Sequence, residues 1–426
     1  MISTSGCCSP TLTPGNPAVK TRILFLSFYY PPDLSAGSFR AEALVKALLD
    51  NVGDHVEIDV VTTQPNRYHT FKTTASSFEQ SPSLTVRRLA VPAHKSGFID
   101  QAFSFGSFAY QVCKVANSKQ YDLIFATSSR LMTASLGAYI SRKTGTKLYL
   151  DIRDIFVDTL QGVLPPTLGK LASVVFSSIE ASTIRQADKV NLISPGFTPY
   201  FNKRYPDKVF TLHTNGIDEL FLTPPPLPPA PVVTQYLPAL PRRLKIVYAG
   251  NIGTGQGLHL IVPQLAKHLE DEADFHLIGS GGAIERLKKA LAREQVTNVY
   301  LAPPMKRDSL LKLYREADVL FLHLNDMKAF RRVLPSKLFE YAATQKPILA
   351  GLSGYPGRFA SRRIHNTAVF SPCDLEAAIR SFRSLELGPT ARNDFIQKYS
   401  RTAIKRRMAF DLLTTSPKHS EFEQTE

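Results

Sequence analysis

Short, almost continuously apolar segments alternate along the chain with longer segments whose apolar residues recur at helical spacing. Arg22–Tyr29 is the first apolar run, typical of a strand covered by helices on both faces. Leu44 and Leu48 then stand one helical turn apart, in a predicted helix Ser38–Leu49 that Ser38 can cap. The same pattern predicts strands at Val56–Thr62, Leu84–Val91, Tyr121–Ala126, Lys147–Leu150, Lys189–Ile193 and Phe210–His213, and helices at Phe98–Ala116, Leu131–Arg142 and Leu168–Arg185.

A proline-rich segment separates this half of the chain from a second half with the same alternation. Eight prolines fall between Leu222 and Pro241, a density that excludes a helix or a central strand. It favours an extended spacer, and a ligand for a proline-recognition module is the alternative. Beyond it, the pattern predicts strands at Leu244–Tyr248, Phe275–Ile278, Val299–Leu301, Val319–His323, Ile348–Ala350 and Ala368–Phe370, and helices at Leu258–Leu269, Ala283–Glu294, Asp374–Leu385 and Ala391–Leu413.

Two such series of strands and helices predict two parallel-sheet α/β domains. In these sheets ligands bind at the carboxyl ends of the strands, so the cleft between the domains is the expected site. The predicted organisation is a disordered leader (1–20), a first domain (21–221), a linker (222–242), a second domain (243–390), a final helix (391–413) and a disordered tail (414–426).

The composition of the chain indicates which class of protein it belongs to. The chain has 426 residues with 43% hydrophobic and 20% charged residues, which is typical of a globular protein. It has no apolar run long enough to span a bilayer, no signal-peptide pattern at the N-terminus, and no cysteine spacing typical of zinc or disulfides, so we expect a cytoplasmic protein.

The net charge of +15 indicates an anionic partner. Nucleic acid is disfavoured because no zinc-finger or RNP-type motif is present and the basic residues are scattered. An anionic membrane surface is a second possibility, since the aromatic residues of Phe98–Ala116 could enter its interface. The alternative is that these aromatic residues belong to the core of an ordinary helix.

The segment from Arg332 to Gly351 carries the clearest candidate chemistry. Pro335 and Ser336 can each begin a helix there, and Lys337 and Glu340 share a face of its first turn. A helix N-terminus attracts phosphate, and a carboxylate one turn later can accept hydrogen bonds from ribose hydroxyls. The spacing therefore suggests a nucleoside diphosphate site. A surface Lys–Glu pair is the alternative.

Glycine-rich turns follow two strands of the second half. Gly250-Asn251-Ile252-Gly253 would let a ligand approach the backbone closely, although a plain tight turn has the same sequence features. The chain has no P-loop motif, which argues against a P-loop nucleotidase. No Asp-x-Asp follows a strand, so no metal ligand set is expected.

Four further segments, taken together and in this order, carry a family resemblance. They are Phe28–Pro32 with Ala36–Arg40, Asp151–Asp154, Val247–Gly253 and Pro335–Tyr341. The chain resembles a family 4 glycosyltransferase of the GT-B fold, of the branch that builds bacterial surface polysaccharides. The resemblance runs from Arg22 to about Leu413. It implies an α/β fold of two Rossmann-like domains facing across a cleft, with a final helix that crosses back to the first domain.

The resemblance also implies roles for individual residues. Glu340 matches the second glutamate of the family's E-x7-E motif, which holds the donor ribose, and Gly37 matches a glycine whose amide meets the phosphates. Asp154 is the candidate catalytic residue, near the expected anomeric carbon; an internal Asp–Arg pair with a helix cap is the alternative for Asp151–Asp154. The implied donor-binding residues are Gly37, Gly250, Asn251, Gly253, Gly279, Arg332, Ser336, Lys337, Leu338 and Glu340.

Two departures from the family pattern concern charge. Arg332 stands where the family has its first glutamate, which usually meets the sugar hydroxyls. Asn251 and Gln256 stand in the glycine turn that usually carries an arginine and a lysine for the diphosphate. We expect Lys337 to replace that charge, assisted by Arg331 or Arg332.

The resemblance implies transfer of a hexose or N-acetylhexosamine from a nucleotide-sugar, UDP-linked, to a glycan or lipid-linked acceptor. Retention of anomeric configuration is implied, with no metal or other cofactor, at the inner face of the cytoplasmic membrane. Two alternatives stay open. One is a sugar-nucleotide epimerase of the same fold, and the other is an inactive adaptor of a partner transferase, suggested by Arg332.

Overall fold

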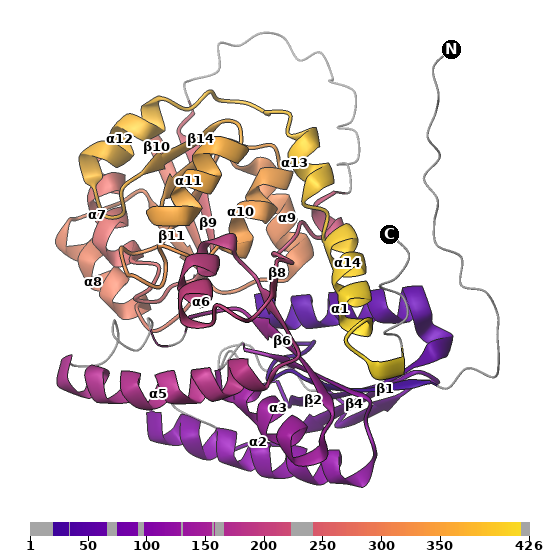
Figure 1. Cartoon of the computed structure of the whole chain (residues 1–426). Coiled ribbons are helices and arrows are strands. Elements are labelled where there is room, and N and C mark those ends of the chain that lie inside the picture. Colours follow the sequence, from indigo (N-terminus) through magenta and orange to yellow (C-terminus); the bar gives the residue numbers. More distant parts are fainter. Residues whose placement is uncertain are drawn as a thin grey trace, which may run out of the picture.

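The computed structural model describes residues 20–33, 35–65, 75–92, 98–128, 131–155, 157, 166–222 and 242–418. Within these residues the chain forms two sheets of predominantly parallel strands, each flanked by helices, as the sequence predicted (Figure 1). Nearly all of the predicted leader, most of the proline-rich linker and the end of the tail lie outside the described residues.

The first domain is built on an eight-stranded sheet of order β3-β4-β2-β1-β5-β6-β7-β8. All its strands pair in parallel except the short edge strand β3. The strands are β1 (Thr21–Leu26), β2 (Val56–Thr63), β3 (Phe78–Gln80), β4 (Leu84–Leu89), β5 (Leu123–Thr127), β6 (Lys147–Ile152), β7 (Lys189–Leu192) and β8 (Phe210–Thr211). The helices are α1 (Ala36–Val52), α2 (Phe98–Ser118), α3 (Leu131–Thr144), α5 (Pro166–Gln186) and α6 (Thr198–Arg204), with 3-10 turns at Gly53–His55 and Pro195–Phe197.

The second domain is built on a six-stranded, fully parallel sheet of order β11-β10-β9-β12-β13-β14. The strands are β9 (Leu244–Asn251), β10 (Ala273–Ser280), β11 (Val299–Ala302), β12 (Val319–His323), β13 (Ile348–Gly351) and β14 (Thr367–Phe370). The helices are α7 (Leu258–His268), α8 (Ile284–Arg293), α9 (Arg307–Glu316), α10 (Ser336–Ala343), α11 (Gly354–Arg363), α12 (Leu375–Arg383), α13 (Asn393–Lys398) and α14 (Arg401–Leu413).

The chain crosses between the domains twice, and the two crossings lie side by side. Ile217 follows β8, and Phe221 lies in a 3-10 turn (Glu219–Phe221), yet both pack in the core of the second domain. On the return crossing, α14 lies beside α1, where Met408 and Leu412 join the core of the first domain (Figure 1). The two crossings are hydrogen-bonded to each other, so the domains are joined at one edge.

The predicted final helix Ala391–Leu413 is in fact two helices, α13 and α14. The break falls where the second crossing pairs with the first. The backbone N–H of Ile217 donates to the carbonyl of Tyr399 at 2.8 Å, and the N–H of Arg401 donates to the carbonyl of Ile217 at 2.9 Å. Because this pairing engages the backbone of the chain between the two helices, the helix is interrupted there.

Three further details of the sequence interpretation differ from the structure. α1 begins two residues before the predicted cap Ser38, and its capping residue is Ser35. β1 ends at Leu26, and the apolar residues up to Tyr30 continue as a buried loop. Among the described helices and strands, β3, α6, α9 and α11 had no sequence prediction. The first turn of α11 contains Gly354, Pro356 and Gly357, residue types that are typical of turns.

Candidate functional site

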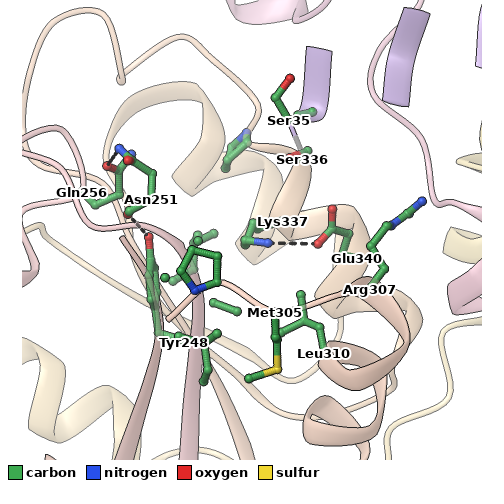
Figure 2. Close-up of a pocket in the computed structure, with 18 of the residues that line it drawn as sticks. Ser35, Tyr248, Asn251, Gln256, Met305, Arg307, Leu310, Ser336, Lys337 and Glu340 are labelled. Carbon is green, nitrogen blue, oxygen red and sulfur yellow. Dashed lines mark hydrogen bonds and ion pairs between the residues drawn. The ribbon is translucent and has the colours of Figure 1, made fainter. Parts of the chain in front are cut away.

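A cavity of about 380 Å³ opens between the carboxyl ends of the second sheet and the start of α1 (Figure 2). The second domain supplies most of its wall, from the ends of β9, β10 and β12, the loop after β11 and the start of α10. The first domain contributes Ser35, Ala36 and Phe39. Of the predicted donor-binding residues, the cavity brings together Gly250, Asn251, Gly279, Ser336, Lys337 and Glu340.

Lys337 and Glu340 form the charged centre of the cavity (Figure 2). The ammonium of Lys337 donates to the Glu340 carboxylate at 3.1 Å, and their side chains are 23% and 15% exposed. Burial opposes the charge on Lys337, but the Glu340 carboxylate together with the neighbouring Tyr341 and Tyr248 outweighs it, and the pKa of Lys337 lies above its ordinary value. Lys337 is therefore a cation at neutral pH. The predicted pair exists, and it lines a cavity instead of an open surface.

The first residues of α10 determine where Lys337 and Glu340 lie. Ser336 is its first residue, not its cap, and Pro335 stands at the capping position without a side-chain hydrogen bond to the first turn. The positive end of the helix dipole therefore lies at the cavity wall beside the Lys337 ammonium. On the opposite side of the helix, Leu338 is fully buried in the core, so it anchors α10 and does not line the cavity.

The glycine turn after β9 forms the cavity wall beside Lys337. A Cβ at Gly250 would lie 3.0 Å from Cε of Lys337, so glycine leaves room for the lysine stem. Asn251 and Gln256 bond to each other, with the Asn251 amide donating to Gln256 at 2.8 Å (Figure 2). Gln256 also accepts the N–H of Gly253 at 3.2 Å. The two residues that replace the expected cations thus close the turn on itself.

His323, at the end of β12, contacts the backbone of this turn. One ring nitrogen lies 2.6 Å from the carbonyl oxygen of Gln256, and the other accepts the N–H of Cys373 at 3.0 Å. Burial lowers the pKa of His323 to about 4, so the ring is neutral at physiological pH. A neutral imidazole satisfies both contacts, as donor to the carbonyl and acceptor from the amide. Sequence reasoning treated His323 only as part of a strand.

The first domain presents the start of α1 to the cavity. Ser35 caps this helix, because its hydroxyl accepts the N–H of Ser38 at 3.1 Å. A Cβ at Gly37 would lie 2.9 Å from Nη1 of Arg153, so glycine permits the arginine to approach the helix start. Two helix N-termini, those of α1 and α10, therefore flank one cavity, an arrangement suited to an anion.

Arg307 is a cavity residue that sequence reasoning missed, because α9 was not predicted. It lies near Glu340 in Figure 2. Its guanidinium pairs with Asp218 at 2.6 Å and stacks over the ring of Phe39, with 4.4 Å between Cζ and the ring centroid. Asp218 also pairs with Arg401 of α14. Arg307 thus connects the cavity to the first domain and to both crossings.

Six of the predicted site residues lie outside the described cavity lining: Gly37 and Leu338, described above, together with Gly253, Asp154, Arg331 and Arg332. Arg331 forms a bidentate pair with Asp326, with hydrogen bonds of 2.8 and 2.6 Å, at the surface. Arg332 extends towards Tyr200 of the first domain. Asp154 is exposed just beyond β6, and Gly253 lies within the glycine turn.

Asp151 of the Asp151–Asp154 motif has a structural role. Its carboxylate accepts two hydrogen bonds from Arg40 of α1, both at 2.8 Å, and a third from Asn191 at 2.6 Å. Burial opposes its charge, but the Arg40 guanidinium prevails and holds the pKa of Asp151 well below its usual range. Asp151 therefore belongs to a buried Asp–Arg pair, but its partner Arg40 lies on α1, outside the Asp151–Asp154 motif in which the pair was considered from sequence.

Two kinds of feature are absent from the described residues. No three or more His, Cys, Asp or Glu side chains come together there in a way that could hold a metal ion. Within the same residues, no helix is both long and apolar enough to cross a bilayer.

Comparison with known proteins places this site in a family context. Residues 238–402 match the family model described as Glycosyl transferases group 1. A segment of 101 residues is 37% identical to the putative colanic acid biosynthesis glycosyl transferase WcaI of Escherichia coli (strain K12), over 23% of this chain and 24% of that protein. The probable glycosyltransferase WbjE of Pseudomonas aeruginosa is 22% identical over 70% of this chain and 75% of its own length.

Solved structures share the whole architecture. The crystal structure of Anabaena Alr3699/HepE in complex with UDP is similar with a TM-score of 0.54 and 14% identity, over 95% of this chain and 99% of that one. The fold is thus that of GT-B glycosyltransferases, two Rossmann-like domains facing across a cleft. With the matched family model and the relatives' names, the comparisons support a GT-B glycosyltransferase.

Proposed function

We propose that this glycosyltransferase transfers a hexose or N-acetylhexosamine from a UDP-sugar to a glycan or lipid-linked acceptor in surface polysaccharide biosynthesis, as a member of family 4. The observation that carries the proposal is the cavity in which Lys337, Glu340 and two helix N-termini converge. One relative is named for colanic acid biosynthesis and one structural neighbour holds UDP, and we extend both features to this chain.

In the proposed complex, Glu340 accepts hydrogen bonds from the ribose hydroxyls and Lys337 meets the diphosphate. Lys337 and Glu340 are hydrogen-bonded in the structure, so in the complex the phosphates take over the ammonium from the carboxylate, which is then available to the ribose. As the bond to the sugar breaks, negative charge grows on the leaving diphosphate. Lys337 and the starts of α1 and α10 stabilise that charge without moving, and no metal is needed.

The acceptor binds on the first-domain side of the cleft, where we propose a polar or acid/base role for Asp154. It lies just beyond β6, at the carboxyl end of the first sheet. We further propose that the anomeric configuration is retained. The leaving diphosphate then helps to deprotonate the acceptor hydroxyl on the same face of the sugar.

We also propose that the first domain attaches to an anionic membrane surface through α2 and α5. On α2, Phe103 is 72% and Tyr110 64% exposed, with the Lys114 ammonium 4.6 Å from the Tyr110 ring centroid. The buried Phe108, by contrast, packs on Phe28. The aromatic residues of α2 thus divide between core and surface. α5 adds the exposed Val174, and such apolar side chains beside lysine suit a lipid interface.

The test combines binding and transfer in the presence of EDTA. Calorimetric titration with UDP and uridine asks whether the cavity binds nucleotide, and incubation with radiolabelled UDP-sugars and a polyprenyl-diphosphate-linked sugar asks whether transfer occurs. We expect UDP binding, transfer that survives EDTA, and a product of unchanged anomeric configuration. Conversion of a UDP-sugar to its epimer without any acceptor would instead identify an epimerase. Binding without transfer to any acceptor would refute the proposed reaction.

A further inference from the structure

We propose that Arg332 and Val333 form an interdomain contact that positions α10 for catalysis, so that Arg332 acts as a positioning residue and does not bind the sugar. The inference rests on the proposed function and goes beyond it, because it assigns a role to the arginine that stands where the family has a glutamate. The segment is separated only by Leu334 from Pro335, Ser336 and Lys337, which line the cavity.

The contact joins the 3-10 turn Pro195–Phe197 and α6 of the first domain to this segment. The hydroxyl of Ser194 donates to the carbonyl of Arg332 at 2.6 Å. The Arg332 guanidinium lies against the ring of Tyr200, with 5.3 Å between Cζ and the ring centroid. Tyr200 is itself held, since its hydroxyl donates to the buried Glu180 at 3.0 Å. Arg332 thus uses both its backbone and its side chain to contact the first domain.

Close packing makes this contact specific. A Cβ at Gly196 would lie 2.2 Å from the Arg332 carbonyl oxygen and 2.9 Å from Cβ of Tyr355, so only glycine allows the turn to approach so closely. Val333, the next residue, packs against the hydrophobic cores of both domains. The N–H of Tyr355 in α11 donates to the carbonyl of Arg331 at 2.7 Å, which fixes the segment from the second-domain side.

The contact at Arg332 lies between the two domains, where it can limit their relative rotation. The domains are covalently joined only through the two crossings, which pair at Ile217 and Ser400. Rotation about that edge would change the distance between α1 and α10, and with it the spacing of the two helix N-termini around the leaving group. The contact at Arg332 opposes such rotation. It therefore matters most in the transition state, when both helix ends act on the same charge.

The test compares Arg332→Ala with Arg332→Lys, which keeps a cation over the ring, and with Arg331→Ala as a matched control. Arg331 is adjacent, equally charged and engaged with Asp326 instead of the first domain. We expect Arg332→Ala to lower kcat about five- to thirtyfold, which is the effect of losing an interaction of the cation–π class. The donor KM and the affinity for UDP should change less than about twofold. Arg332→Lys should restore most of kcat, and Arg331→Ala should leave it unchanged.

Small-angle scattering adds a readout that does not depend on activity. We expect Arg332→Ala to shift the scattering profile towards a larger radius of gyration than wild type, and Arg331→Ala to match wild type. Lower UDP affinity with unchanged kcat would place Arg332 on the donor and overturn the inference. Equal defects in both alanine variants would also overturn it. If wild type neither binds UDP nor transfers sugar, the proposed function fails, and identical scattering of wild type and Arg332→Ala would separately refute the contact's role.

Discussion

Replacing Lys337 and Glu340 one at a time should separate diphosphate recognition from ribose recognition. The two side chains touch each other at 3.1 Å, yet in the proposed complex they meet different parts of the donor. Glu340→Gln keeps the shape of the side chain but removes the charged acceptor. Lys337→Met keeps most of the apolar stem but removes the cation. The ligands that distinguish them are uridine, which has the ribose alone, and UDP, which also has the phosphates.

The magnitudes follow from the low exposure of both side chains. A hydrogen bond to a charged group contributes about 1.5–3 kcal/mol, or roughly ten- to a hundredfold in affinity. Glu340→Gln should lower the affinities for uridine and for UDP by similar factors within that range, since both ligands carry the ribose. Lys337→Met should lower the affinity for UDP by a similar factor and leave the affinity for uridine nearly unchanged. It should also lower kcat, because charge grows on the diphosphate in the transition state.

Calorimetric titration of each variant with each ligand decides the question, with Lys306→Met as the control. Lys306 is exposed and lies beside the cavity residues Met305 and Arg307, so its loss changes net charge equally without touching the ligand. It should alter UDP affinity by less than about twofold because surface charges are screened. Identical profiles for Lys337→Met and Glu340→Gln would refute separate roles. If neither affects binding, the pair is a structural ion pair.

Three residues and one surface give the remaining predictions. The folded state holds His323 neutral, so the free energy of unfolding should fall by up to about 3 kcal/mol as the pH drops from about 6.5 to about 4. Urea unfolding at several pH values should show this dependence on pH for wild type but not for His323→Gln. Lys405 of α14 is buried, and burial together with the nearby Arg40 lowers its pKa. Lys405→Met should therefore raise the unfolding free energy by about 1 kcal/mol or more at pH 7, and this gain should shrink towards pH 10. Asp154→Asn should fold normally and lose most turnover with UDP affinity nearly unchanged; near-wild-type turnover would contradict its assignment. Liposome sedimentation should depend on anionic lipid and weaken in Phe103→Ser, and equal binding to neutral vesicles would remove the membrane proposal.

The fold could be predicted from sequence because its strands are buried on both faces and read as unbroken apolar runs. The strands β2, β6 and β12 were placed within two residues of their observed ends for this reason. The sequence prediction missed elements in which polar residues outnumber buried apolar ones. The helix α9 buries only Leu311 and Tyr314 along ten residues, which gives a weak apolar pattern. The break between α13 and α14 depends on a partner nearly two hundred residues away in sequence, so no local signal marks it.

The candidate site was predicted in part for a related reason. Lys337, Glu340 and the glycine turn belong to one domain and to local motifs, so their proximity follows from parallel-sheet geometry. Arg307 enters the cavity from an element without a motif, and Phe39 enters it from the other domain. Sequence spacing also could not show that the Arg331 and Arg332 side chains lie outside the described cavity lining, because their partners Asp326 and Tyr200 are recognised only in three dimensions.

The electrostatics of the cavity link the two departures from the family pattern. Asn251 and Gln256 are uncharged and hydrogen-bond to each other, so the glycine turn brings no formal charge to the proposed diphosphate site. The described cavity lining instead offers Lys337 and Arg307 as cations, each already paired with a carboxylate, and the dipoles of two helices from different domains. A helix dipole acts over little more than its first turn, so its effect requires that α1 and α10 stay close. An enzyme that draws part of its stabilising charge from across a cleft therefore depends on how the domains are held. An arginine committed to the interdomain contact, at the position of a sugar-binding glutamate, is consistent with that dependence.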